Sequence, residues 1–455
     1  MRRGALRQEF RNLFALAAPL AAAQAGTQLM SVVDVAVLGR VGGRELAASG
    51  LGSAIFFAFS ILGMGLVFGI DPLVSQALGA GNRARARFVM WQGVWLALIV
   101  TGILTIPMLF GPMIMRAVGV QGDLIPPATV YLFIRIAGLA PFLLFLVVRA
   151  YLQAHHVTRP MVLAMVVGNI YNLGADILLV FGGSVLPEWT GPLRSIPAMG
   201  IAGAAIATVT GQILQLGIII LGVRALEDER GLEVSHRPDR REIYKAFQVG
   251  WPVALQMGAE VGIFALVALL AGRLGTLDLA AHQLVINIAA FTFTVALGVA
   301  AAASVRVGRA IGARDHEGTR LAGYAAFAGG AIVMSIGALL FILFPRAIAR
   351  MLTDDPAVIA AAIPLLFVAA LFQLSDGTQA VGAGVLRGAA DTKFAFLANL
   401  VGHWLIGFPI ALYLGFSLQM GIVGLWWGFV AGLTVVAALL LIRFHRLAAR
   451  PIAAL

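Results

Sequence analysis

Long apolar runs, separated by short clusters of charged and polar residues, follow one another along the whole 455-residue chain. A helix needs about 20 mostly apolar residues to cross a bilayer, and charged side chains rarely interrupt such a run. Membrane β-strands would alternate apolar and polar positions over about 10 residues, and no stretch of this sequence does so for long. The pattern therefore predicts an all-α integral membrane protein with 12 transmembrane helices. The expected spans are at about residues 13–38, 46–78, 88–113, 128–153, 161–181, 200–223, 246–271, 279–304, 321–344, 357–386, 394–416 and 418–442.

Composition supports a membrane protein and excludes several other classes. Apolar residues make up 60% of the chain and charged residues 12%, against about 45–50% and about 25% in soluble domains. The absence of cysteine excludes disulfides, thiolate nucleophiles and cysteine metal sites. Residues 1–12 are basic, and the apolar run of about 26 residues after them is too long for the core of a signal peptide. We therefore expect this run to be the first span.

The 32 basic residues are unevenly distributed, and their distribution sets the expected orientation. With the N-terminus inside, the inner segments hold 24 of them, the outer loops hold 7, and Arg135 lies within a span. Cytoplasmic loops of membrane proteins carry an excess of Lys and Arg, so both termini are expected in the cytoplasm. The net charge of +11 is then a consequence of topology and does not indicate a nucleic-acid-binding groove.

The first half of the chain recurs in the second half. With a shift of 233 positions, residues 39–42 (GRVG) fall on 272–275 (GRLG), and residues 46–48 (LAA) fall on 279–281 (LAA). The same register holds over about 70 residues, which indicates an internal duplication.

The duplication predicts two lobes of six helices each. These are residues 1–223 and 246–455, joined by a long polar linker at 224–245 that we expect to act as a cytoplasmic hinge. Because six helices separate the first span from the seventh, both lobes have the same orientation in the membrane. Parallel repeats with a substrate site at their interface are typical of transporters, which favours alternating access over a duplicated channel.

Few ionisable side chains interrupt the first six spans. A charge at mid-bilayer costs about 2.5–3.5 kcal/mol on insertion scales, so each one that persists is a candidate for function. Asp34 lies in the outer part of the first span, either as an interfacial acid or as part of a site. Asn169, Asn172 and Asp176 are spaced by three and four residues and share one helical face at a similar depth. The two carboxylates, Asp34 and Asp176, and the two amides, Asn169 and Asn172, could form an oxygen-rich pocket for a proton or a hard cation; the alternative is a hydrogen-bonded helix contact.

The second half has its own intramembrane acids. Glu260 lies well inside the seventh span and has no basic residue on its helix face. Asp376 belongs to a polar stripe in the tenth span, with Gln373 and Gln379 three residues away on either side. Neither acid can easily extend to the membrane surface, so both are candidates for a functional site.

A substrate cavity is expected among apolar and amide side chains near these acids. The candidates are Met257, Phe264, Gln283, Asn287, Gln373 and Gln379. Methionine and aromatic side chains can repack around varied substrates, although facing lipid is their commoner role.

Three other ionisable residues are open to interpretation. Asp71, before Pro72, is expected to have a structural role. Arg135 either neutralises a carboxylate or extends toward the membrane surface. We expect His282 to be a hydrogen-bonded residue more than a proton carrier.

Several motifs in the two halves of the chain recur together in one protein family. The matching positions in the first half are Val33-Asp34, Gly39-Arg40, Asn172 and Asp176. Those in the second half are 252–260 (PVALQMGAE), 279–283 (LAAHQ) with Asn287, 304–308 (SVRVG), 372–376 (FQLSD), 386–388 (LRG) and 391–392 (DT). Together they resemble the NorM-type branch of the MATE (multidrug and toxic compound extrusion) proteins, and the resemblance covers nearly the whole chain. The one departure is that this branch often has Asn at the position of Asp176.

The resemblance implies a V-shaped bundle of two six-helix lobes that exports organic cations in exchange for H⁺ or Na⁺. Carried to the matching positions, the family roles make Glu260 and Asp376 the cation or proton site of the second lobe, where Na⁺ would bind. Asp34, Asn172 and Asp176 become the proton-linked site of the first lobe. No cofactor other than the coupling ion is expected.

The expected function is therefore secondary active multidrug efflux by alternating access. We expect a monomer in the bacterial cytoplasmic (inner) membrane, with organic cations and the lipid bilayer as its partners and no nucleic acid. The closest alternative is a lipid-linked oligosaccharide flippase, but such proteins line their cavity with Arg and Lys, whereas here only Arg135 lies within a span. An enzyme is disfavoured because the sequence has no nucleophile triad, metal cluster or phosphate-binding glycine loop.

Overall fold

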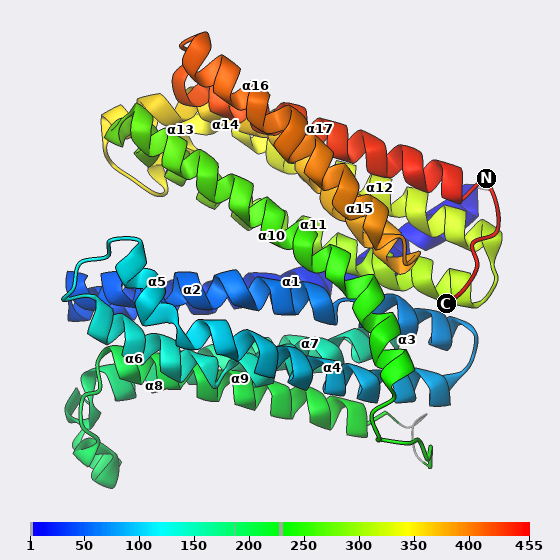
Figure 1. Cartoon of the computed structure of the whole chain (residues 1–455), viewed down its shortest axis with the longest axis horizontal. Coiled ribbons are helices and arrows are strands. Elements are labelled where there is room, and N and C mark those ends of the chain that lie inside the picture. The colour runs from blue at the N-terminus through cyan, green and yellow to red at the C-terminus, as the bar shows by residue number, and fades with distance from the viewer. Residues whose placement is uncertain (1–2, 186, 227–230) are drawn as a thin grey trace. The chain divides into compact units, whose positions relative to one another are not determined.

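The computed structural model describes residues 3–185, 187–226 and 231–455, and these parts of the chain are helical without any β-strand (Figure 1). Within them, 12 helical segments are long and apolar enough to cross a membrane, which confirms the predicted number. The segments of the first half are α1 (Arg3–Val41), α2 (Gly43–Val67) continued by α3 (Ile70–Gly79), α4 (Arg83–Leu109), α6 (Ile125–Ile136) continued by α7 (Leu139–Ala154), α8 (Arg159–Phe181) and α9 (Ile201–Arg224). Those of the second half are α10 (Arg240–Leu274), α11 (Thr276–Gly312), α12 (His316–Leu343), α14 (Pro356–Gly388), residues Thr392–Ser417 and α17 (Gly421–Leu447).

The remaining elements are short or irregular. The eleventh span begins as α15 (Thr392–Asn399), continues through the π-helical turns η4 (Leu400–Gly407), α16 (Phe408–Leu412) and the π-helical turns η5 (Tyr413–Ser417). π-Helical turns are rare and often lie at functional sites. The others are the helices α5 (Gly111–Ala117) and α13 (Pro345–Arg350) and the 3₁₀ turns η1 (Gly183–Val185) and η2 (Glu188–Ser195).

Close helix packing depends on glycine at a few positions. A Cβ atom on Gly298 of α11 would lie 2.6 Å from the backbone nitrogen of Ala21 in α1. Membrane helices approach closely through small residues because van der Waals contact and not the hydrophobic effect drives their association. The glycine therefore sets the distance between α1 and α11.

The described chain divides into two compact units, each of which contains one of the candidate acid clusters. One unit comprises Ala25–Ile70 and Arg83–Gln248, and the other comprises the residues up to Gln24 together with Asp71–Asn82 and Val249–Leu455. The units differ from the expected lobes of 1–223 and 246–455, because the start of α1 and most of α3 group with the second half of the chain.

Ion pairs hold these two segments within the second-half unit. Glu9 of α1 forms a two-pronged ion pair with Arg306 of α11, with 2.7 Å between Glu9 Oε1 and Arg306 Nε. Asp71 of α3 lies 3.2 Å from Arg387 Nε of α14, so its expected structural role is that of an ion-pair partner.

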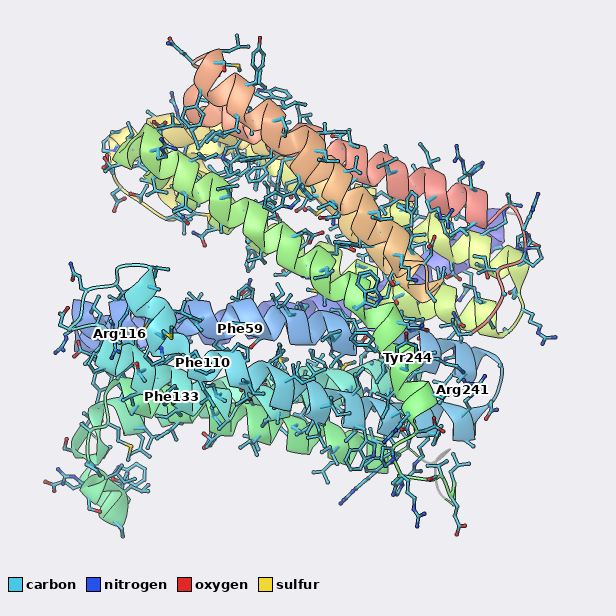
Figure 2. All side chains as sticks on the ribbon, viewed as in Figure 1. Phe59, Phe110, Arg116, Phe133, Arg241 and Tyr244 are labelled. Atoms are coloured by element: carbon cyan, nitrogen blue, oxygen red, sulfur yellow. The ribbon has the colours of Figure 1, made fainter. Side chains whose placement is uncertain are left out.

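The described part of the expected hinge, residues 231–245, is fastened to α4. Trp95 Nε1 donates to the His236 carbonyl at 2.8 Å, and Gln92 Nε2 donates to the Arg237 carbonyl at 3.1 Å. Gln92 Oε1 also accepts from the Asp239 backbone at 2.7 Å. Tyr244, labelled in Figure 2, lies in the last part of this segment, on the first turns of α10. Residues 227–230 of the linker lie outside the described residues.

Much of the surface of the first-half unit is apolar. Phe110 and Phe133, labelled in Figure 2, are 57% and 43% exposed. Exposed side chains of this kind are expected where helices face lipid instead of water.

Candidate functional site

A buried carboxylate cluster lies in the unit formed by Ala25–Ile70 and Arg83–Gln248. Asp34 of α1 is 9% exposed, and Asn172 and Asp176 of α8 are fully buried. The Asp34 carboxyl interacts with both of these side chains, and Thr208 Oγ1 of α9 donates to Asp34 Oδ2 at 2.9 Å. The structure thus brings together three of the four residues that the sequence placed at one depth, and Asn169 is the exception. We call Asp34, Asn172, Asp176 and Thr208 the first carboxylate cluster.

The oxygen atoms of this cluster are poorly satisfied. Among the described residues, Asp34 Oδ1, both Asp176 oxygens and both Asn172 amide atoms are buried without a hydrogen bond of good geometry. Buried polar groups in folded proteins are nearly always bonded, and buried carboxylates need a compensating charge or proton. The cluster is therefore suited to taking up a small cation or a proton.

Arg135 of α6 belongs to the same neighbourhood. Its charge interacts with Asp34, and its guanidinium carbon lies 4.5 Å from the centroid of the Phe56 ring in α2. Both roles considered for this residue stay predictions, because its Nε and Nη1 atoms have no hydrogen-bond partner among the described residues.

Asn169, on the same face of α8, has a different role. Its Nδ2 atom donates to the Gly26 carbonyl of α1 at 3.0 Å and to the Met165 carbonyl at 2.8 Å. The side chain therefore joins α8 to α1 beside the first carboxylate cluster.

A second carboxylate cluster lies in the other unit. Glu260 Oε1 of α10 accepts hydrogen bonds from three amides: Gln256 at 3.1 Å, Gln379 of α14 at 2.5 Å, and Asn399 of α15. Asp376 of α14 is 7% exposed and interacts with the charge of Glu260. We call Glu260, Asp376 and these three amides the second carboxylate cluster. The structure thus places the two acids singled out from the sequence in one cluster.

Two of the amides in this cluster were not predicted. Gln256 lies four residues before Glu260, a spacing that could have identified it. Asn399 lies four residues before the buried His403, a spacing that could have identified a polar face of this span. Its Oδ1 atom is buried without a hydrogen bond among the described residues.

The candidate cavity residues lie in different environments. Phe264 packs against the Phe429 ring at 4.8 Å between centroids and against Phe372 at 6.3 Å. Met257 is half-buried, whereas Gln283 is exposed.

The remaining polar candidates also differ from one another. Gln373 is fully buried, and its amide atoms have no hydrogen bond in the part of the chain that is described. Asn287 is exposed and donates to the Gln283 carbonyl at 2.7 Å. Trp426 Nε1 donates to Nδ1 of the buried His282 at 3.2 Å, in agreement with the expected role of that histidine.

Neither cluster resembles a classical metal centre. The described residues contain no group of three or more His, Cys, Asp or Glu side chains that could hold a metal ion. In the second cluster, two carboxylates lie among amide groups, and oxygen ligands of this kind suit a hard cation such as Na⁺.

Twelve membrane-spanning segments with two buried carboxylate clusters define a multi-pass membrane transporter. Comparison with known proteins identifies the family. The family model MatE matches residues 19–178 and 252–413, and the chain belongs to this family. The two matches begin 233 positions apart, which is the shift of the internal repeat.

Similar proteins cover almost the full length of the chain. A probable multidrug resistance protein NorM from Rhizobium meliloti is 34% identical over 98% of this chain and 95% of its own. A multidrug resistance protein NorM from Burkholderia vietnamiensis is 35% identical over 94% and 92%, and a multidrug resistance protein MdtK from Yersinia pseudotuberculosis is 31% identical over 98% and 97%. The family and these relatives identify a transporter and not an enzyme.

Solved structures have the same fold. The crystal structure of the eukaryotic MATE transporter AtDTX14 matches with a TM-score of 0.84 at 21% identity and covers 98% of both chains. The crystal structure of MATE in the straight conformation matches with a TM-score of 0.86 at 20% identity, over 97% of this chain and 96% of that chain.

Proposed function

We propose that the chain is a multidrug efflux antiporter that exports lipophilic or cationic organic compounds in exchange for H⁺ or Na⁺ by alternating access. The names of its NorM and MdtK relatives support drugs as the substrates. The observation that carries the ion coupling is the pair of carboxylate clusters within the spans, whose acids form no ion pair among the described residues. An acid in a span that is not ion-paired needs a proton or a cation.

Coupling follows from competition for negative charge. When the carboxylates hold neither a proton nor Na⁺, their negative charge attracts a cationic substrate. When a proton or Na⁺ is bound, that charge is neutralised and the affinity for the substrate falls. By thermodynamic reciprocity, binding of the substrate lowers the affinity for the ion to the same extent.

The second carboxylate cluster is built to exchange its ion. Three amide N–H groups donate to one oxygen of Glu260. Hydrogen bonds to a charged group contribute about 1.5–3 kcal/mol each, so the amides stabilise Glu260 after its ion has left. The role of the amides is then to prevent the ion from binding too tightly to be released.

The membrane gradients are sufficient to drive export. A potential of 100 mV supplies about 2.3 kcal/mol per charge, and one pH unit supplies about 1.4 kcal/mol per proton.

The proposal includes the place of the protein in the cell. Both termini lie in the cytoplasm, and the protein works as a monomer in the bacterial inner membrane.

A flippase for lipid-linked oligosaccharides is a weaker proposal. Such a protein needs basic side chains available to bind pyrophosphate. Arg135, the basic residue within a predicted span, lies over the Phe56 ring.

Proteoliposomes containing the purified protein test the proposed function. We expect transport of tetraphenylphosphonium, a lipophilic cation, when a pH gradient or, separately, a Na⁺ gradient is imposed, and none without a gradient. Transport that responds to neither gradient would rule out the antiporter.

A further inference from the structure

The segment between α8 and α9 contains an insertion that the second half of the chain lacks. In the internal repeat, Gly168 corresponds to Gly402, and residues 199–201 (MGI) correspond to 420–422 (MGI). The interval between these positions is 31 residues in the first half and 18 in the second, so the first half has 13 additional residues. In the second half, a turn at residues 418–420 is enough to join the same pair of spans. The insertion is therefore not required to connect the two helices.

The insertion is fixed at its base to the end of α8. The Gly183 backbone donates to the Ile196 carbonyl at 2.8 Å, and the Met199 backbone donates to the Leu179 carbonyl at 2.8 Å. The 23 residues of α8 rise about 35 Å, slightly more than the thickness of the hydrocarbon core, about 30 Å. A helix of this length reaches both surfaces of the bilayer, so residues 183–196 begin at the level of the lipid headgroups.

The helix that holds the insertion has a lipid-facing stripe along its length. Five apolar side chains of α8 are exposed at alternating spacings of three and four residues, which places them on one helical face. They are Leu163, Val166, Ile170, Leu173 and Ile177. At the end of α8, the green segment that follows turns to the side instead of continuing along the helix axis (Figure 1). A segment that leaves a span sideways at headgroup level lies along the membrane surface.

The side chains of the insertion do not pack into the helices. Trp189 of η2 is 84% exposed, the largest exposed fraction of any large hydrophobic side chain that is described. Val185 and Leu193 are exposed as well, and so is the basic Arg194. Tryptophan is enriched at the surfaces of membranes, where its ring meets the acyl chains and its N–H group stays hydrated. Basic side chains next to such residues suit the phosphate groups of lipids.

We propose that residues 183–196 form a membrane-surface anchor, in which Trp189 and Leu193 enter the boundary between headgroups and acyl chains and Arg194 lies at the lipid phosphates. The anchor fixes the depth of α8 and α9 in the bilayer. The second half of the chain has no counterpart, so the anchor acts on one member of the duplicated pair alone. It does not depend on the coupling ion or on the transported compound.

A fluorescent reporter on the insertion tests this proposal. Because the chain contains no cysteine, a single introduced cysteine can be labelled selectively. The variant Ser195→Cys, at an exposed position two residues after Leu193, is labelled with the polarity-sensitive dye NBD and placed in nanodiscs of phosphatidylcholine and phosphatidylglycerol. We expect a lipid that carries a nitroxide near its headgroup to quench the dye more strongly than iodide in the water does. The same dye on Ser235→Cys, in the exposed linker, should be quenched more strongly by iodide.

Matched substitutions separate anchoring from mere proximity to the membrane. Trp189→Ser in the labelled Ser195→Cys protein should lose quenching by the nitroxide lipid and gain quenching by iodide. Glu188→Gln changes the exposed neighbour of Trp189 and should leave both unchanged. Unaltered thermal unfolding of each variant shows that the helices remain folded.

Two results would overturn the proposal. In the first, iodide quenches the dye at position 195 and the nitroxide lipid does not, which places the insertion in water, where a protein could bind it. In the second, Trp189→Ser leaves the quenching as it was. Neither result affects the proposed transport function, because gradient-driven transport is measured separately.

Discussion

Asn399 offers a quantitative test of how the second carboxylate cluster controls its ion. Its amide donates to Glu260 Oε1 from a fully buried position in α15. A hydrogen bond to a charged group contributes about 1.5–3 kcal/mol and one to a neutral group about 0.5–1.5 kcal/mol. The variant Asn399→Ala therefore disfavours the ion-free carboxylate relative to the ion-bound one by about 1–1.5 kcal/mol. Because 1.4 kcal/mol corresponds to tenfold, we expect the half-saturating ion concentration to fall about five- to tenfold.

The assay is the initial rate of drug transport in proteoliposomes as a function of H⁺ or Na⁺ concentration. Tighter ion binding also slows release, so the maximal rate should fall together with the half-saturating concentration. Gln121→Ala is the matched control, since Gln121 is an exposed amide in the turn between α5 and α6, outside both carboxylate clusters. An unchanged half-saturating concentration in a folded, active Asn399→Ala protein would refute the role assigned to the amides.

Three further predictions concern the fold. Gly298→Ala should lower the unfolding temperature because its Cβ would meet the Ala21 backbone, whereas Gly102→Ala, with open space around it, should not. Glu9→Gln leaves the partly buried Arg306 without its charged partner, and thermal unfolding in detergent should show a loss of about 1–3 kcal/mol. Gln92→Ala removes two hydrogen bonds to the linker, and limited proteolysis should then cut residues 231–239 faster. An unchanged rate of cleavage would contradict the conclusion that Gln92 holds the linker against α4.

The transmembrane spans could be predicted from the sequence because hydropathy is a local property. The first carboxylate cluster could also be predicted in outline, since Asp34 and Asp176 stand out in apolar runs and their position along each span gives their depth. Their hydrogen-bond partner Thr208 could not, because threonine is common in membrane helices and nothing in its spacing relates it to Asp34.

The contacts of the linker could not be predicted from the sequence, for a different reason. Its charged composition indicates a cytoplasmic hinge, but Trp95 and Gln92 donate hydrogen bonds to its backbone carbonyls. Every residue has the same backbone carbonyl group, whatever its side chain, so no sequence pattern identifies such an acceptor. The partnership of Asn399 with Glu260 could not be predicted, because its spacing to His403 shows a polar helix face but only the fold brings that face to Glu260.

Gradient-driven transport by the Asp376→Asn variant tests the central claim most directly. Glu317→Gln, which neutralises an exposed acid at the start of α12, is the control. If the buried carboxylates couple the ion gradient to drug movement, Asp376→Asn protein that is folded and still binds tetraphenylphosphonium loses gradient-driven transport, and the control retains it. Transport by Asp376→Asn at the rate of the unaltered protein would contradict the account.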